Sequence, residues 1–127
     1  MLSITAIYAG LLGLLLVVLS FGVIRERLRH QVSLGDGGNA DLQTASRRQG
    51  NFVEYVPLAL LLIAIAEVNG APSGLVHGLG ATLVVGRVLH PLGLAAEFGV
   101  RVPRLVGTVA TFGVIIVASV VDLMSVL

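Results

Sequence analysis

Cysteine is absent from this 127-residue chain, and charged residues make up only 12% of it. Without cysteine, the chain has no disulfide, no thiol nucleophile and no thiolate ligand for a metal. The charged fraction is about half that of a typical soluble domain, whereas 56% of the residues are hydrophobic and the mean hydropathy is +0.99. A soluble chain this small cannot bury so much apolar surface, so we expect lipid to be its solvent.

Signals of the common soluble enzymes and of nucleic-acid binding are also missing. A net charge of +1, without a basic patch among aromatic residues, predicts no nucleic-acid partner. The three histidines and the carboxylates show no metal-ligand spacing, so the sequence predicts no metal site. Residues 35–38, Gly-Asp-Gly-Gly, lack the lysine and the preceding strand of a phosphate-binding loop, and no serine lies in a nucleophile elbow.

Four apolar runs are long enough to cross a bilayer. The first, residues 1–24, is not expected to be a cleaved signal peptide, because basic residues follow it and none precede it. Pro57 lies inside the second run and predicts a kink near Val53. The sequence therefore predicts an all-α integral membrane protein, a four-helix transmembrane bundle forming one domain over residues 1–127. The expected helices cover roughly residues 3–24, 43–68, 73–94 and 103–124.

The basic residues are confined to two of the three connections between these runs. They are Arg25, Arg27, Arg29, Arg47, Arg48, Arg87, Arg101 and Arg104. By the positive-inside rule, this distribution places the arginines in the cytoplasm and both termini outside. These arginines could have a second role, in binding a ligand. Alternatively, they only set the orientation of the chain in the membrane and extend toward lipid headgroups. We prefer that alternative for the three arginines that follow the first run.

The second run opens with an unusually polar segment, residues 47–57. On a helix, Arg47, Asn51 and Glu54 fall on one face. The residues that flank this face are Arg48, Gln49 and Tyr55. Glu54 lies about 9–10 Å below the arginines at 1.5 Å per residue, well inside a hydrocarbon core of roughly 30 Å. An ionisable residue at that depth indicates a functional site, although Glu54 pairing with an arginine that anchors the helix end is the simpler alternative.

The pattern Arg-x-Gln-x-Asn-x-x-Glu-Tyr-x-Pro over residues 47–57 resembles the second-helix signature of the MAPEG proteins, the membrane-associated proteins of eicosanoid and glutathione metabolism. Gly86-Arg87-x-x-His90 is similar to their third-helix pattern, and the chain is closest to the small bacterial members. The resemblance implies a homotrimer in the bacterial inner membrane. It also implies that glutathione binds between neighbouring subunits on the cytoplasmic side.

The resemblance further implies a set of glutathione-binding residues: Arg47, Arg48, Gln49, Asn51, Glu54, Tyr55, Arg87 and His90. The residue types suit the ligand, because arginine pairs with its carboxylates and a glutamate pairs with its ammonium. Arg101 matches the family's thiolate-stabilising arginine by its offset, with Arg104 as the alternative for this catalytic role. Both could instead merely orient the fourth helix.

The activity implied is that of a glutathione transferase or peroxidase, acting on a hydrophobic electrophile or a lipid hydroperoxide. One departure bears on it, because His90 and Leu94 stand where relatives often have a third-helix tyrosine. The alternative is a non-enzymatic four-helix protein that binds glutathione or membrane lipid, or a small transporter.

Overall fold

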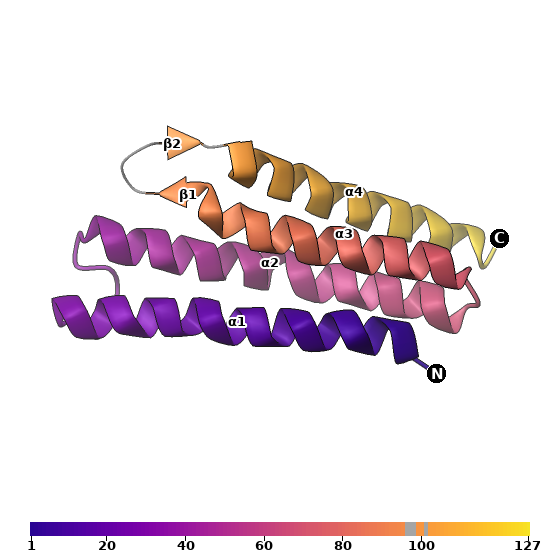
Figure 1. Ribbon diagram of the computed structural model, residues 1–127, viewed down its shortest axis with the longest axis horizontal. Helices are drawn as coiled ribbons and strands as arrows, with labels where there is room; N and C mark the ends of the chain where they lie inside the picture. Colours follow the sequence, from indigo (N-terminus) through magenta and orange to yellow (C-terminus); the bar gives the residue numbers. More distant parts are fainter. Residues whose placement is uncertain (96–98, 101) are drawn as a thin grey trace.

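Four helices packed side by side form the protein in a computed structural model, which describes residues 1–95, 99–100 and 102–127 (Figure 1). They are α1 (Ser3–His30), α2 (Ala40–Val68), α3 (Ser73–Leu92) and α4 (Val102–Met124). Each is long enough and apolar enough to cross a membrane. The predicted all-α, four-helix membrane architecture is therefore confirmed.

The first two helices extend further than the apolar runs that predicted them. α1 continues six residues past residue 24 and ends where Gln31 adopts a left-handed conformation, φ 54°. α2 begins three residues before residue 43, because the side chain of Asn39 accepts a hydrogen bond from the Leu42 N–H at 3.0 Å and caps the helix. Both extensions lie beyond the apolar runs, where arginine side chains such as Arg25 and Arg29 are exposed.

α3 is two residues shorter than expected, because the chain leaves the helix after Leu92 and forms a short antiparallel pair. Strand β1 (Leu94–Ala95) pairs with β2 (Gly99–Val100). Gly93 makes this exit possible, since a Cβ at this position would overlap the backbone of Arg104 in the first turn of α4. The end of α3 and the start of α4 therefore meet backbone to backbone.

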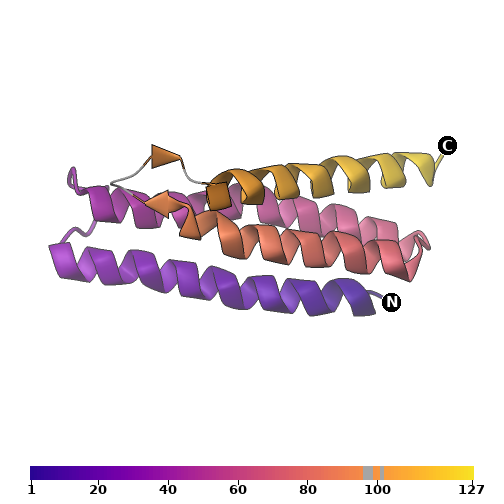
Figure 2. The same cartoon turned by 45° about the horizontal axis from the view of Figure 1, so that its top comes forward.

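The chain reverses at each connection, so both termini lie at the same end of the bundle (Figures 1 and 2). We call this the terminal end. The opposite end holds the α1–α2 and α3–α4 connections, and we call it the arginine end, because every described arginine belongs to its half of the helices. Arg101 lies outside the described residues.

Apolar side chains from all four helices fill the interior, including Leu12, Phe52, Ile63, Leu83 and Val114. Large apolar side chains also cover the outward faces, where lipid or another subunit can contact them. Burial between helices gains little when the alternative solvent is lipid, so close packing and polar contacts carry more of the stability. The two ends of the bundle differ in both respects.

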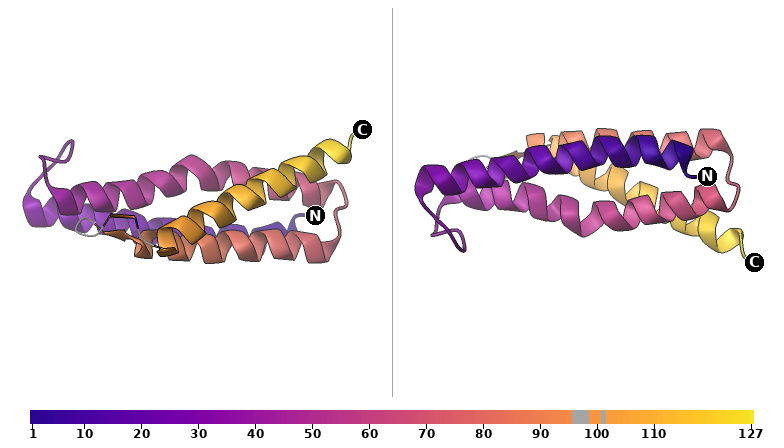
Figure 3. Two further views of the ribbon diagram at one scale, coloured as in Figure 1. Left: turned by 90° about the horizontal axis from the view of Figure 1, so that it is seen from above. Right: turned by 90° about the horizontal axis from the view of Figure 1, so that it is seen from below.

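α3 and α4 touch closely at the arginine end and separate toward the terminal end, as Figure 3 shows. A Cβ on Gly107 of α4 would overlap the carbonyl oxygen of Gly86 and crowd His90, both on α3. Toward the terminal end, a groove of about 370 Å³ opens between the two helices. Its lining includes Gly74, Gly78 and Gly113.

Polar contacts join the helices at the terminal end. The Glu67 carboxylate accepts the N–H groups of Ile4 and Thr5 at 2.8 and 2.7 Å, and so caps the first turn of α1 from α2. A 2.8 Å hydrogen bond joins the Tyr8 hydroxyl to His77 Nδ1, which links α1 to α3. The Asn69 amide donates to Ser125 Oγ at 3.0 Å, which links α2 to the end of α4.

Candidate functional site

An ion pair faces outward from the membrane-spanning part of α2. Arg47 donates to the two carboxylate oxygens of Glu54 at 3.3 and 3.5 Å, across two helical turns. The two side chains are 59% and 50% exposed. A charged pair on the surface of a membrane helix is costly in contact with lipid, so this face requires water, a ligand or another subunit against it.

Arg87 lies in the interior beside this face and is only 1% exposed. Its Nη2 donates to Asn51 Oδ1 at 2.7 Å, and its Nη1 lies 3.5 Å from Thr111 Oγ1. The guanidinium carbon also sits 5.8 Å from the centre of the Phe52 ring, within range of a cation–π contact. Arg87 thereby connects α2, α3 and α4.

No carboxylate among the described residues pairs with Arg87, and its Nε has no hydrogen-bond partner there. One turn further along α3, His90 is 2% exposed, and its Nδ1 also lacks a partner within the described part of the chain. Positive charge is thus buried here without a compensating anion among the residues that the structure describes. Such a site favours an anionic ligand.

The residues that flank the predicted face bind neighbouring elements instead of facing outward. The Arg48 guanidinium donates twice to the Leu94 carbonyl oxygen, at 3.0 and 2.6 Å, and holds the end of α3 against α2. Gln49 donates to Ser20 Oγ on α1 at 3.0 Å. The Tyr55 ring packs edge-on against Phe112 of α4, with the ring centres 5.3 Å apart.

The structure therefore divides the predicted glutathione-binding residues into an exposed pair and six residues that contact other parts of the bundle. Arg47 and Glu54 share an exposed face, whereas Asn51 is turned inward toward Arg87. The other four contact the bundle itself: Arg48, Gln49, Tyr55 and His90. Whether each binds the ligand stays a prediction.

The two candidate catalytic arginines differ in what the structure describes. The structure places Arg104 in the first turn of α4, half-buried, with its backbone against Gly93 at the arginine end. Arg101 was the preferred candidate, but it lies outside the described residues. The catalytic role of either residue stays a prediction.

A second concave surface, which the sequence did not indicate, lies at the arginine end between α1, α2 and α3. It has a volume of about 820 Å³. Its apolar part includes Leu15, Val18, Leu19 and Phe21, and its polar rim includes Arg25, Glu26, Arg29, Asp41 and Arg48. The sequence pattern explains the arginines of α1 as orientation signals, and the alternation of charge within residues 25–29 is its one indication of this rim.

Comparisons with known proteins agree with the helical architecture and with the second-helix pattern. The sequence model of the MAPEG family matches residues 5–124, nearly the whole chain. Two similar relatives are both described as inner membrane protein YecN, from Escherichia coli strain K12 and from Escherichia coli O6:H1 strain CFT073. Each is 46% identical over 90 residues, which cover 71% of this chain and 69% of the relative.

Proposed function

This chain belongs to the MAPEG family, and from that premise we propose that it is an inner membrane protein that binds glutathione. We propose further that it uses glutathione as a transferase or peroxidase toward hydrophobic electrophiles or lipid hydroperoxides. The observation that carries the proposal is the outward-facing pair of Arg47 and Glu54 on a membrane helix, beside the buried Arg87, which has no carboxylate partner in the described part of the chain.

The chemistry of glutathione fits these residues. The peptide has one ammonium and two carboxylates, so a glutamate and an arginine held side by side match its γ-glutamyl end. In the absence of ligand, Arg47 and Glu54 satisfy each other. When the peptide binds, Glu54 exchanges the guanidinium for the ammonium, and Arg47 exchanges Glu54 for a carboxylate, so neither charge is left unpaired.

Assembly as a homotrimer supplies the cover that this face requires. Glu54 and the adjacent Leu58 are both exposed on α2, and a neighbouring subunit placed against them would remove charge from lipid. The ligand would then lie between subunits at the arginine end. We propose that this end faces the cytoplasm, as the positive-inside rule requires, with both termini outside.

Bound glutathione supplies a thiol that reacts with electrophiles once it is ionised. Its unperturbed pKa of about 8.5 leaves only a few per cent ionised at pH 7. A guanidinium close to the sulfur favours the thiolate and lowers that pKa. We propose Arg101 for this task, with Arg104 in the first turn of α4 as the alternative.

A non-enzymatic role in binding glutathione or lipid is the second candidate, and one observation favours it. No phenol stands at position 90 in α3 or at position 94 in β1, where His90 is buried and the Leu94 carbonyl oxygen accepts hydrogen bonds from Arg48. A protein that binds glutathione without these phenols can hold the peptide without accelerating its reaction.

The test begins with binding. The purified chain in lipid nanodiscs is titrated with glutathione by calorimetry, alongside Glu54→Gln and the control Asp36→Asn, which removes a carboxylate in the α1–α2 connection, away from the Arg47–Glu54 face. A charge-assisted hydrogen bond contributes about 1.5–3 kcal/mol, so Glu54→Gln should weaken binding by roughly 10- to 150-fold. The control should bind as the wild type does. Equal affinities for wild type and Glu54→Gln would contradict the proposed site.

Turnover is then measured with hydrophobic electrophiles and lipid hydroperoxides. Glutathione-dependent conversion that Glu54→Gln lowers in parallel with binding supports the enzyme. Tight glutathione binding without conversion of any of these substrates supports the second candidate.

A further inference from the structure

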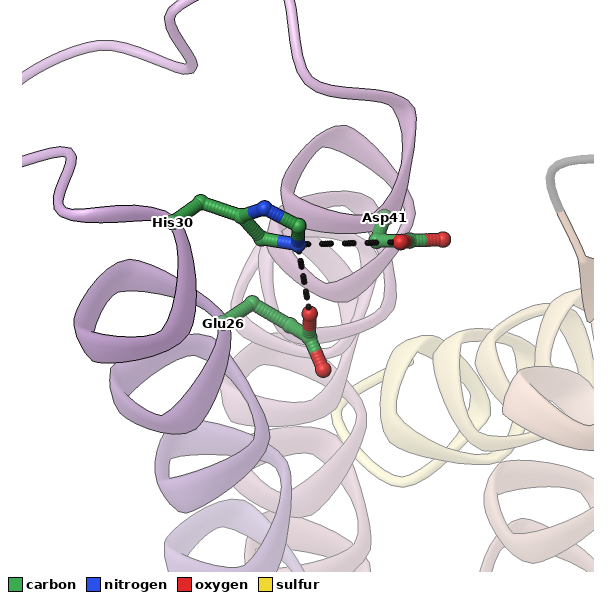
Figure 4. A group of neighbouring side chains, drawn as sticks. All are labelled: Glu26, His30 and Asp41. Atoms are coloured by element: carbon green, nitrogen blue, oxygen red, sulfur yellow. Dashed lines mark ion pairs between the residues drawn. The ribbon is translucent and has the colours of Figure 1, made fainter.

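Three potential metal ligands meet where α1 ends and α2 begins. Figure 4 shows the His30 ring with one nitrogen directed at two carboxylates, those of Glu26 and Asp41. Nε2 of His30 lies 3.4 Å from Glu26 Oε2 and 3.7 Å from Asp41 Oδ2. All three ligand atoms lie within 4.8 Å of one another.

Two of these ligand atoms are buried and lack hydrogen-bond partners among the described residues. Glu26 is only 5% exposed, and although its Oε1 accepts a hydrogen bond from Arg25 at 3.2 Å, its Oε2 accepts none. His30 Nε2 is likewise without a hydrogen bond. Buried polar atoms are nearly always paired in folded proteins, so two orphaned atoms that face each other indicate an absent partner.

We propose that Glu26, His30 and Asp41 bind one divalent transition-metal ion, for which Zn²⁺ is the best match. Zinc bonds to histidine nitrogen and carboxylate oxygen are about 2.0–2.2 Å long, so tetrahedral ligand atoms are roughly 3.3–3.6 Å apart. The observed 3.4 and 3.7 Å are close to this spacing. One imidazole and two carboxylates form a borderline N/O ligand set, and water completes the fourth position.

The fold explains why these residues meet. Glu26 and His30 are four residues apart on α1 and therefore share one face, and the α1–α2 connection brings Asp41 to them. The carbonyl groups at the C-terminal end of a helix carry partial negative charge, which favours a cation there. The Asp41 side chain is 59% exposed, so an ion can enter from its side.

Two other cations compete for the same oxygens. Arg29 lies 3.9 Å from Glu26 Oε2, but its side chain is 67% exposed and can turn into water. A proton on Nε2 would let His30 bridge the two carboxylates without any metal. Metal binding at a ligand that can carry a proton releases that proton, which gives the two states distinct signatures.

Such an ion would link the end of α1 to the start of α2 at the rim of the 820 Å³ concave surface. The proposed metal site does not depend on glutathione binding, because none of its three ligands belongs to the Arg47–Glu54 face. The failure of one proposal therefore leaves the other intact.

The test uses the full chain without a histidine tag, in nanodiscs and in a non-chelating buffer. Calorimetry with ZnCl₂ should show saturable binding of one ion per chain, with proton release detected in buffers of different ionisation enthalpy. His30→Gln and Asp41→Asn should weaken binding by roughly tenfold or more. His77→Gln, which removes a histidine at the terminal end, should leave the affinity unchanged. CoCl₂ should produce the visible absorption of tetrahedral cobalt in the wild type.

Two results would overturn the proposal. In the first, the wild-type protein shows no saturable Zn²⁺ binding. In the second, the wild type binds Zn²⁺, but His30→Gln weakens this binding no more than His77→Gln does. Circular dichroism establishes that each variant is folded. The stoichiometry and the cobalt spectrum of the wild type need no variant, so they decide the matter even if a variant does not fold.

Discussion

At the terminal end of the bundle, Glu67 gives both carboxylate oxygens to the backbone of α1, whereas at the arginine end Glu54 faces outward with Arg47 beside it. Tyr8 and His77 likewise satisfy each other at the terminal end. Within the described residues, Arg87 at the other end has no carboxylate partner.

The contrast has two exceptions and a clear meaning. Near the terminal end, the carboxylate oxygens of Asp122 and Oγ1 of Thr5 lack hydrogen-bond partners in the described part of the chain. Apart from these, the side chains that join helices at the terminal end, such as Glu67, Tyr8 and Asn69, bind within the same chain and stabilise the single subunit. At the arginine end, Arg48 and Gln49 also bind within the chain, but Arg47, Glu54 and Arg87 retain capacity for something outside the subunit, such as a ligand or a neighbour.

Helix packing gives the largest expected difference between the two ends. Gly107→Ala places a Cβ against the Gly86 carbonyl, and overpacking of this kind costs about 1–3 kcal/mol. Gly113→Ala adds the same methyl group six residues later, where nothing lies within 4 Å of the new Cβ. We expect thermal unfolding in detergent, followed by circular dichroism, to show a lower Tm for Gly107→Ala and an equal or higher Tm for Gly113→Ala. Equal destabilisation of both variants would mean that the close crossing is not confined to the arginine end.

Removing the Glu67 charge is the complement of the Glu54→Gln experiment. Glu67→Gln weakens the cap on the first turn of α1, and the loss of a helix cap costs about 0.5–2 kcal/mol. We expect a lower Tm with unchanged glutathione affinity, whereas Glu54→Gln should lose affinity with little change in Tm. Measuring the Tm and the glutathione affinity of both variants checks this prediction. If Glu67→Gln weakened glutathione binding as much as Glu54→Gln does, the two ends would not differ in function.

The smallest expected effect lies in the α1–α2 connection. The backbone N–H of Gly38 and then the side chain of Gln43 hydrogen-bond to Asp36 and hold the pKa of its carboxyl below the ordinary value. A lowered pKa means that this stabilisation is complete above about pH 3.9 and is lost as the pH falls through the folded-state pKa. Hydrogen-exchange protection factors in the connection, which compare the observed rate with the intrinsic rate at the same pH, should therefore fall in acid in the wild type, and this fall should be absent from Asp36→Asn. An identical acid response in the two proteins would show that the connection does not depend on this carboxylate.

The sequence predicted the four helices because apolar length and arginine placement are properties of the chain itself. It was less informative about the polar face of α2, where Asn51 lies one turn from Arg47 and at the edge nearer the core. Contact with Arg87 turns that side chain inward, and the second-helix pattern alone does not reveal a partner on α3. The sequence predicted no metal site, because Glu26 and His30 are only two potential ligands one helical turn apart and Asp41 reaches them only through the fold.

Because the two termini leave the bundle at the same end, copies of the chain can be joined head to tail without any linker crossing the membrane (Figure 1). A tandem polypeptide of three copies would fix the number of subunits by covalent means. It would also allow Glu54→Gln to be introduced into one copy at a time. Activity as a function of the number of altered copies would then count how many subunits share each binding site.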